Sequence, residues 1–409
     1  MADFYQTGMV PTLHRLTPNG VERLEAELER HARTRPIGLV LPALYSEFEK
    51  PAMPRIIQEL RKVRYLQRIV VALGRAEPAQ YLRVLDLFRD FYTPVDVIDI
   101  ESGRIQALLR MLEERGLSPG PDGKGRSCWL SYGLVLAAGD CEVIALHDCD
   151  IVNYDRQLLA RLCFPVVHPN LGFEFCKGYY ARVTERMHGR VTRLFFTPLV
   201  RSMMGMQPGS SFLQFLDSFR YGLAGEFAMN ADLARVNRIP SDWGLEVGIL
   251  AEIFRNCATA RTCQVDLMDS YEHKHQDLSA GDPGKGLAKM ASEIAKSLFR
   301  TTTSEGMVFT SEQFRTLQVR YVRMAQDTIA RYYADAMLNG LQFDRHAEEA
   351  AVNVFAKSLS RAAEEFLADP LGVPPIPNWN RVLAAIPEFF ELLLDAVARD
   401  SRRSLRLAS

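Results

Sequence analysis

Two aspartates with one residue between them, Asp148 and Asp150, follow an apolar run in the sequence. Residues 141–147 resemble a short strand buried on both faces, and the acids stand at its carboxyl end. In open α/β sheets, ligands bind beyond the carboxyl ends of the strands. Two carboxylates there repel each other unless a cation lies between them, and hard oxygen ligands suit Mg²⁺ or Mn²⁺. The spacing therefore predicts a divalent metal, although aspartates also commonly cap turns and helices at strand ends.

Two further groups could bind anions. Lys124 lies between two glycines just before a predicted helix, where its ammonium and the backbone amides can meet a phosphate. Gly189 precedes Arg190 and Thr192 at another predicted helix start, and an arginine with a hydroxyl suits a carboxylate or a phosphate. The alternatives are a surface turn with a solvated lysine and an ordinary polar first turn of a helix.

A carboxylate and two histidines complete the set of candidates. Glu246 falls in the first turns of a helix predicted at 243–254, among apolar neighbours, so it needs a partner. That partner is a sugar hydroxyl, an anomeric centre or the start of its own helix. His273 and His275 would face the same way in an extended segment, and a histidine can complete a metal site begun by the acids. A solvated polar loop is the alternative for them.

The elements that must position these residues alternate between strand and helix before Asp148. Strands are predicted at 37–41 (ending at Pro42), 69–73 and 95–98. Helices are predicted at 21–32, 56–66, 81–91, 105–115 and 127–138. This order is typical of βαβ units on a parallel sheet. No GxGxxG follows the first strand, so the dinucleotide-binding fingerprint is absent.

After Asp150 the pattern changes. Residues 171–183 alternate in part, which favours a strand added late to a mixed sheet, and residues 264–267 predict another strand. Residues 279–286 form a loop whose GDPGKG lacks the spacing of a Walker motif. Beyond residue 287 only helical patterns occur, among them 311–339 and 379–398. We therefore expect an α/β catalytic domain at 1–300 and an all-helical domain at 301–409.

Composition narrows the class of protein. The 409 residues are 47% hydrophobic, which is ample for two domains, and the net charge of −1 gives no sign of a nucleic-acid surface. No apolar run reaches the roughly 18 residues that span a bilayer, and the first residues lack a signal-peptide core. The seven cysteines show no CxxC pairing, so we expect reduced, buried thiols in a cytoplasmic protein.

Taken in order along the chain, the motifs resemble those of the retaining glucosyl-3-phosphoglycerate synthases and, more distantly, the mannosylglycerate synthases. Both are nucleotide-sugar glycosyltransferases of the A-type, Rossmann-like α/β fold, and the helical tail is similar to that of the second group. The matching segments are LPAL (41–44), GKG (123–125), DCD (148–150), KGYYAR (177–182), GRVT (189–192), AGE (224–226), WGLEVG (243–248) and YEH (271–273).

The resemblance implies a role for each site residue. The expected neighbours of the donor are Pro42, Ala43, Leu44, Lys124, Asp148 and Glu226. The expected metal ligands are Asp150 and His273, for Mg²⁺ or Mn²⁺. The residues expected to hold the acceptor are Gly189, Arg190, Thr192 and His275, the last standing where the family has an asparagine. Glu246 and Asp150 are the residues expected at the reacting centre.

Independently of the resemblance, the helical tail carries two apolar stripes, one of Phe314, Leu317, Tyr321 and Met324 and one of Phe389, Leu392, Leu393 and Val397. We expect them to pack on the same chain and to contribute to a homodimer.

The implied reaction moves glucose from a nucleoside diphosphate to 3-phosphoglycerate with retention. Tyr45 and Ser46 depart from the Asn-Glu that usually follows "PAL", and residues 73–77 depart from the family's Asp, Ser and Gly, so UDP and GDP both stay open. Mannosyl transfer from GDP-mannose to glycerate or 3-phosphoglycerate is the nearest alternative. A metal-dependent nucleotidyltransferase and a nucleotide-sugar-binding protein are the others. Same-face attack and a covalent intermediate on Glu246 are both compatible with the sequence.

Overall fold

The computed structural model describes residues 6, 8–17, 20–272 and 285–408, the last six by their backbone only. Its centre is a mixed sheet with the strand order β1-β8-β6-β7-β5-β2-β3-β4. The strands are β1 (Thr12–Leu13), β2 (Ile37–Leu44), β3 (Leu66–Gly74), β4 (Val95–Asp99), β5 (Val143–Leu146), β6 (Phe175–Tyr180), β7 (Phe227–Asn230) and β8 (Thr262–Met268). Only β7 runs antiparallel to its neighbours, β5 and β6. The expectation of a mixed α/β sheet is confirmed.

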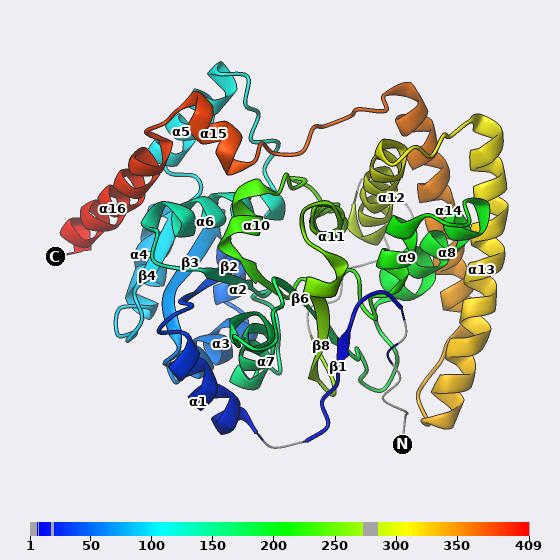
Figure 1. Ribbon diagram of the computed structural model, residues 1–409, viewed down its shortest axis with the longest axis horizontal. Helices are drawn as coiled ribbons and strands as arrows, with labels where there is room; N and C mark the ends of the chain where they lie inside the picture. Colours follow the sequence, from blue (N-terminus) through cyan, green and yellow to red (C-terminus); the bar gives the residue numbers. More distant parts are fainter. Residues whose placement is uncertain (1–5, 7, 18–19, 273–284, 409) are drawn as a thin grey trace.

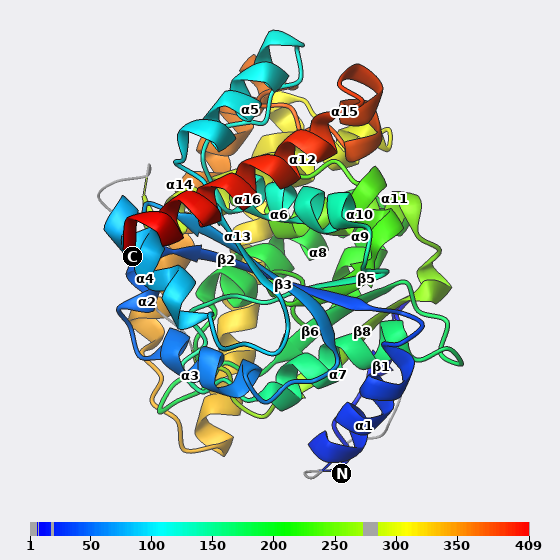
Figure 2. The ribbon, with the colours of Figure 1, turned by 90° about the vertical axis from the view of Figure 1, so that its left-hand side faces the viewer.

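Helices cover both faces of the sheet (Figures 1 and 2). One layer contains α5 (Gly103–Glu114), α6 (Lys124–Ala138) and α16 (Phe389–Ala408), and the other contains α1 (Val21–His31), α3 (Ala52–Leu60) and α7 (Arg156–Val167). The remaining helices of the α/β part are α2 (Tyr45–Phe48), α4 (Pro78–Leu87), the π-helix η1 (Val191–Phe196), α8 (Thr197–Met206), α9 (Ser211–Asp217), α10 (Ala231–Val236), α11 (Leu245–Asn256) and the 3₁₀ turn η2 (Thr259–Arg261). The amphipathic patterns predicted this layering because each helix must bury one apolar stripe.

Proline explains two differences from the predicted elements. Strand β2 does not end at Pro42 but continues to Leu44. Beyond Val40 it pairs with β3 alone, and a strand without a neighbour on one side tolerates a residue that lacks an N–H. The helix predicted at 379–398 is instead two, α15 (Trp379–Ala385) and α16, because Pro387 interrupts the helical backbone between them.

The helices after residue 285 divide between two places (Figure 1). Helices α12 (Gly286–Ser304), α13 (Ser311–Leu338) and α14 (Arg345–Ala368) pack against η1, with α13 also on α8. Residues 369–378 then lead back across the molecule to α15 and α16, which cover α6 and α5. Trp379 stacks on Trp129 of α6, with ring centroids 3.9 Å apart.

One hydrophobic core joins the sheet to these C-terminal helices. It runs from Val40 and Ile144 on the sheet to Phe355 on α14 and Trp379 on α15, all of them buried. The two apolar stripes predicted on α13 and α16 are therefore buried against the same chain. A second core, on the other face of the sheet, lies under α1, α3 and α7. Within the described ranges, no helix is both long and apolar enough to cross a membrane.

Candidate active site

A cavity of about 500 Å³ opens at the carboxyl ends of β2 and β5. Its size falls within the range of pockets that enclose small organic ligands. It brings together most of the predicted site residues, namely Pro42, Leu44, Lys124, Asp148, Asp150, Gly189, Arg190, Thr192 and Glu246. They come from positions more than 200 residues apart in the chain, so the predicted donor, metal and acceptor groups share one enclosure.

Lys124 is the centre of charge in this cavity. Its Nζ lies 2.6 Å from Asp148 Oδ1 and 3.1 Å from Glu246 Oε1. Burial alone lowers the pKa of Lys124, but the carboxylates of Asp148 and Glu246 outweigh it and hold that pKa well above its usual range. The ammonium is therefore charged at every physiological pH. It links the loop after β5 to the first turn of α11.

The two glycines beside Lys124 have a packing role that the sequence did not reveal. A Cβ at Gly123 would lie 2.4 Å from the Ser241 carbonyl oxygen, and one at Gly125 would lie 2.0 Å from the Pro240 carbonyl oxygen. Only glycine allows the start of α6 to come this close to the segment that leads into α11. The close approach is what brings Lys124 within reach of Glu246.

Two of the predicted donor residues lie behind the cavity wall. Glu226 is fully buried, and its carboxylate accepts hydrogen bonds from Tyr180 (2.8 Å) and Tyr271 (2.6 Å), whose rings stack. Burial, reinforced by the nearby Asp148 carboxylate, raises the pKa of Glu226. Ala43 belongs to the second hydrophobic core, because alternate residues of a strand face opposite sides.

The predicted acceptor residues surround the start of a π-helix. Gly189 has a φ of +74°, a left-handed conformation that favours glycine. Arg190 immediately precedes η1, and Thr192 lies within it. Insertions of this kind are frequent at functional sites because they re-aim side chains. Both side chains line the cavity, as Arg182 and Tyr221 also do.

Sequence reasoning missed one residue at this end of the cavity. Glu348 of α14 accepts a hydrogen bond from Arg190 Nε at 2.9 Å and another from Arg193 Nη1 at 2.8 Å. Glu348 is only 5% exposed. A signal was present, because the positions three, four and seven residues later (Ala351, Val352 and Phe355) are apolar and buried. A glutamate on such a stripe needs a charged partner.

The described residues supply part of the expected metal site. Asp148 and Asp150 both line the cavity and offer the hard oxygen atoms that Mg²⁺ and Mn²⁺ prefer. One oxygen of Asp148 already meets Lys124. His273 and His275 lie outside the described residues, so the metal and acceptor roles expected of them stay predictions. The donor set fits a divalent cation through two carboxylates.

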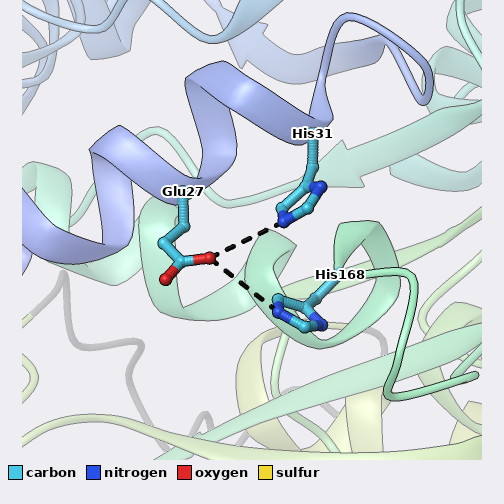
Figure 3. Close-up of side chains that lie close together, drawn as sticks. All are labelled: Glu27, His31 and His168. Atoms are coloured by element: carbon cyan, nitrogen blue, oxygen red, sulfur yellow. Dashed lines mark ion pairs between the residues drawn. The ribbon is translucent and has the colours of Figure 1, made fainter.

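A second cluster of potential ligands joins α1 to the end of α7 (Figure 3). Glu27 Oε2 lies 3.6 Å from His31 Nε2 and 3.8 Å from His168 Nε2. Arg30 Nη2, however, lies 3.0 Å from both Glu27 Oε2 and His31 Nε2. The Asn170 N–H donates to His168 Nδ1, which leaves the ring proton on Nε2 facing Glu27. The cluster is thus organised around the Glu27–Arg30 ion pair of α1, and the His31 and His168 rings, with centroids 4.9 Å apart, join α1 to the end of α7.

Comparison with known proteins identifies the family. No family model matches the chain. The sequence is 50% identical over 401 residues to the glucosyl-3-phosphoglycerate synthase of Persephonella marina, covering 98% of this chain and 99% of that protein. It is 40% identical over 403 residues to the synthase of Methanococcoides burtonii, covering 97% and 98%. The chain belongs to the glucosyl-3-phosphoglycerate synthase family.

Solved structures agree on the fold of this family member. The glucosyl-3-phosphoglycerate synthase of Mycobacterium tuberculosis, in complex with Mg²⁺ and UDP, superposes with a TM-score of 0.53 at 22% identity, covering 74% of this chain and 89% of that one. The mannosyl-3-phosphoglycerate synthase of Rubrobacter xylanophilus gives a TM-score of 0.54 at 20% identity, covering 74% and 83%. The predicted A-type glycosyltransferase fold with a helical C-terminal part is confirmed.

The burial of Lys177, in the KGYYAR segment of this synthase-family chain, makes the free energy of unfolding depend on pH. Its buried ammonium donates to the Ala224 carbonyl oxygen, and burial lowers the pKa of Lys177 from 10.5 to about 8. Below pH 8 the folded and unfolded states both carry the proton, and the cost of burying the charge is present in full. Between pH 8 and 10.5 the unfolded state binds more protons, so the free energy of unfolding rises with pH.

We therefore expect the wild type to gain about 3 kcal/mol in free energy of unfolding relative to Lys177→Met over this pH range. Urea titrations of both proteins at several pH values measure the difference. A difference that stays constant with pH would show that the folded state does not lower the pKa of Lys177.

Proposed function

We propose that this protein transfers glucose from a nucleoside-diphosphate-glucose to 3-phosphoglycerate with retention of configuration, giving glucosyl-3-phosphoglycerate. Identity of 50% along nearly the whole length of a glucosyl-3-phosphoglycerate synthase carries the proposal. The cavity supports it, because Lys124, Asp148 and Glu246 form one charged cluster in it and Arg190 lines the same cavity. The Mycobacterium tuberculosis structures include complexes with Mn²⁺, UDP-glucose and phosphoglyceric acid, and we take UDP-glucose as the donor.

In the reaction, the bond from the glucose C1 to the diphosphate breaks and a bond from C1 to the glycerate hydroxyl oxygen forms. The hydroxyl proton leaves with the departing diphosphate. A bound Mg²⁺ or Mn²⁺ would supply positive charge to that leaving group, with Asp148 and Asp150 as the residues that hold it. Lys124 adds a fixed positive charge at the same end of the cavity.

Glu246 is proposed to orient the sugar and not to attack it. Its carboxylate is 8% exposed and is ion-paired with Lys124 at 3.1 Å. A carboxylate neutralised in this way is a poor nucleophile but a good acceptor for a sugar hydroxyl. This favours attack of the acceptor on the same face from which the diphosphate leaves.

The metal requirement gives a direct prediction. Asp150→Asn removes one anionic ligand but keeps the size of the side chain, so we expect turnover to fall about a hundredfold or more, with an unchanged melting temperature. EDTA should abolish wild-type activity, and added Mn²⁺ should restore it. The control is Asp155→Asn, because Asp155 caps α7 outside the cavity. Full wild-type activity in EDTA would remove the metal from the mechanism.

The proposed reaction is tested by a matrix of donors and acceptors. UDP-glucose, GDP-glucose and GDP-mannose are each combined with 3-phosphoglycerate and with glycerate, and products are identified by mass spectrometry. We expect the largest kcat/KM for UDP-glucose with 3-phosphoglycerate. A larger kcat/KM for GDP-mannose or for glycerate would show that the proposed donor or acceptor is wrong. Binding of the donor without any product would favour a nucleotide-sugar-binding protein.

Three finer features belong to the same proposal. Residues 1–300 are proposed as the catalytic domain and residues 301–409 as a helical domain that shares one hydrophobic core with it. The protein is a homodimer, which is supported by large exposed apolar side chains on α13, namely Val319, Tyr333, Met337 and Leu338. It works in the cytoplasm, which is supported by seven cysteines that are all free. Light scattering of the purified protein tests the dimer.

A further inference from the structure

The acceptor end of the cavity is supported by residues from the C-terminal helices. The segment 183–189 folds back on itself through a bridge between Val183 and Met187. Gln342, in the connection between α13 and α14, donates its backbone N–H to the Glu185 carbonyl oxygen at 2.8 Å and forms a bridge with Arg186. Arg186 and Met187 line the cavity. One wall of the cavity is thus fastened to the helical part of the protein.

Glu348 makes the second and stronger attachment. Its two carboxylate oxygens receive different arginines, Arg190 on Oε1 and Arg193 on Oε2. Arg193 is 8% exposed and is further fixed by donating Nε to the His188 carbonyl oxygen at 2.8 Å. Its guanidinium also lies 4.8 Å from the centroid of the Tyr332 ring on α13. Arg193 and Glu348 therefore form a buried ion pair held in place by several contacts.

Arg190 differs from Arg193 because it contacts the same glutamate but also lines the cavity. Its side chain is 34% exposed, and the contact with Glu348 uses Nε. The contact does not use the Nη atoms of Arg190, which lines the cavity, and these two donors suit two oxygens of a phosphate or carboxylate. A long arginine side chain with several rotamers would otherwise lose entropy each time it bound the acceptor.

We propose that Glu348 is a positioning residue for the acceptor: from the C-terminal helical domain, it holds Arg190 in the orientation that receives the anionic group of 3-phosphoglycerate. The inference rests on the proposed function for the identity of the acceptor. It makes α14 a working part of the active site in addition to a packing element. Glu348 itself contacts the arginines and not the substrate.

The test compares Glu348→Gln with Glu349→Gln. Glutamine keeps the shape of Glu348 but loses its charge, so Arg190 and Arg193 are left to repel each other. Glu349 is the matched control, since it is the next residue of α14, 45% exposed and paired with Arg345 on the surface. We expect Glu348→Gln to raise the KM for 3-phosphoglycerate about ten- to a hundredfold while the KM for the nucleotide sugar stays within about twofold. Glu349→Gln should change neither value.

A double-mutant cycle with Arg190→Ala separates positioning from general stability. If Glu348 acts through Arg190, the double variant should have the same acceptor KM as Arg190→Ala alone. A merely structural carboxylate would instead lower the melting temperature and leave the acceptor KM unchanged. An unchanged or lower acceptor KM in Glu348→Gln, or additive effects in the cycle, would overturn the inference.

Calorimetric titration of 3-phosphoglycerate, without turnover, keeps this test distinct from that of the reaction. If the wild type binds 3-phosphoglycerate and Glu348→Gln binds it about tenfold or more weakly, the positioning role is supported even if glucose is not transferred. Binding of equal strength in both proteins rejects that role, whatever the reaction. Failure of the wild type to bind 3-phosphoglycerate, with or without UDP, would overturn both proposals.

Discussion

Replacing Lys124 with methionine is expected to lower kcat/KM for glucosyl transfer by about two to three orders of magnitude, because removing one preorganised charged group beside a developing charge costs about 3–4 kcal/mol of transition-state stabilisation. The ammonium holds Asp148 at 2.6 Å and Glu246 at 3.1 Å. Without it, the neighbouring carboxylates of Asp148 and Glu246 lose their shared counter-charge, and the departing diphosphate loses a nearby positive charge. We expect most of the loss in kcat, because charge develops on the leaving group in the transition state.

Steady-state kinetics with both substrates varied measures this effect. Lys62→Met is the matched control, because Lys62 makes a single ion pair with Glu59 on the surface. We expect that control to retain wild-type kinetics. Lys124→Met with kcat/KM within about fivefold of wild type would show that the metal alone supplies the positive charge, and Lys124 would then be a structural residue.

Removal of the C-terminal helices is expected to destroy the fold and not only the acceptor site. A chain ending at Ser304 loses α13 to α16, whose apolar side chains belong to the same core as the sheet. Tyr321 is fully buried and donates to the Leu194 carbonyl oxygen at 2.9 Å, and Phe355 packs on Phe195. Loss of a single such aromatic side chain costs about 3–5 kcal/mol, and a typical domain has only about 5–15 kcal/mol of stability.

We therefore expect the chain ending at Ser304 to be insoluble or aggregated and inactive. A chain ending at Arg402, which lacks only the last seven residues, should keep its activity and melting temperature. Size-exclusion chromatography and circular dichroism compare the two with the full chain. A monodisperse and active protein ending at Ser304 would contradict the shared core and would make the helices after residue 304 an independent module.

The strands and helices of the α/β part were predicted well because each is encoded by a short stretch of neighbouring residues. Residues 37–41 and 69–73 are continuous apolar runs, residues 95–98 are apolar except for Asp96, and each segment lies in a strand of the sheet. The motifs at Lys124, Asp148 and Arg190 were each weak alone, but their order along the chain, which resembles that of the synthase family, predicted that they would form one site. The cavity does contain all three.

The contacts of the C-terminal helices were not predictable in the same way. The apolar pattern of an amphipathic helix indicates that one face is buried, but it does not indicate which surface covers that face. Nothing local indicates that α14 packs on η1 or that Trp379 of α15 stacks on Trp129 of α6. Glu348 was missed for this reason, since its partners lie 155 and 158 positions earlier in the chain. Likewise, the glycines beside Lys124 suggested a phosphate-binding loop. Their close packing on residues 240–241 could not be predicted, because that contact depends on tertiary structure.

The central claim is that the cavity joins glucose to 3-phosphoglycerate in the α configuration and releases a nucleoside diphosphate. One mixture of the enzyme, UDP-glucose, 3-phosphoglycerate and Mg²⁺, followed by ¹H and ³¹P NMR, tests it most directly. We predict that UDP and a new anomeric proton with the small coupling of an α-glucoside appear together in equal amounts. A β-linked product, or the release of pyrophosphate in place of UDP, would contradict the account.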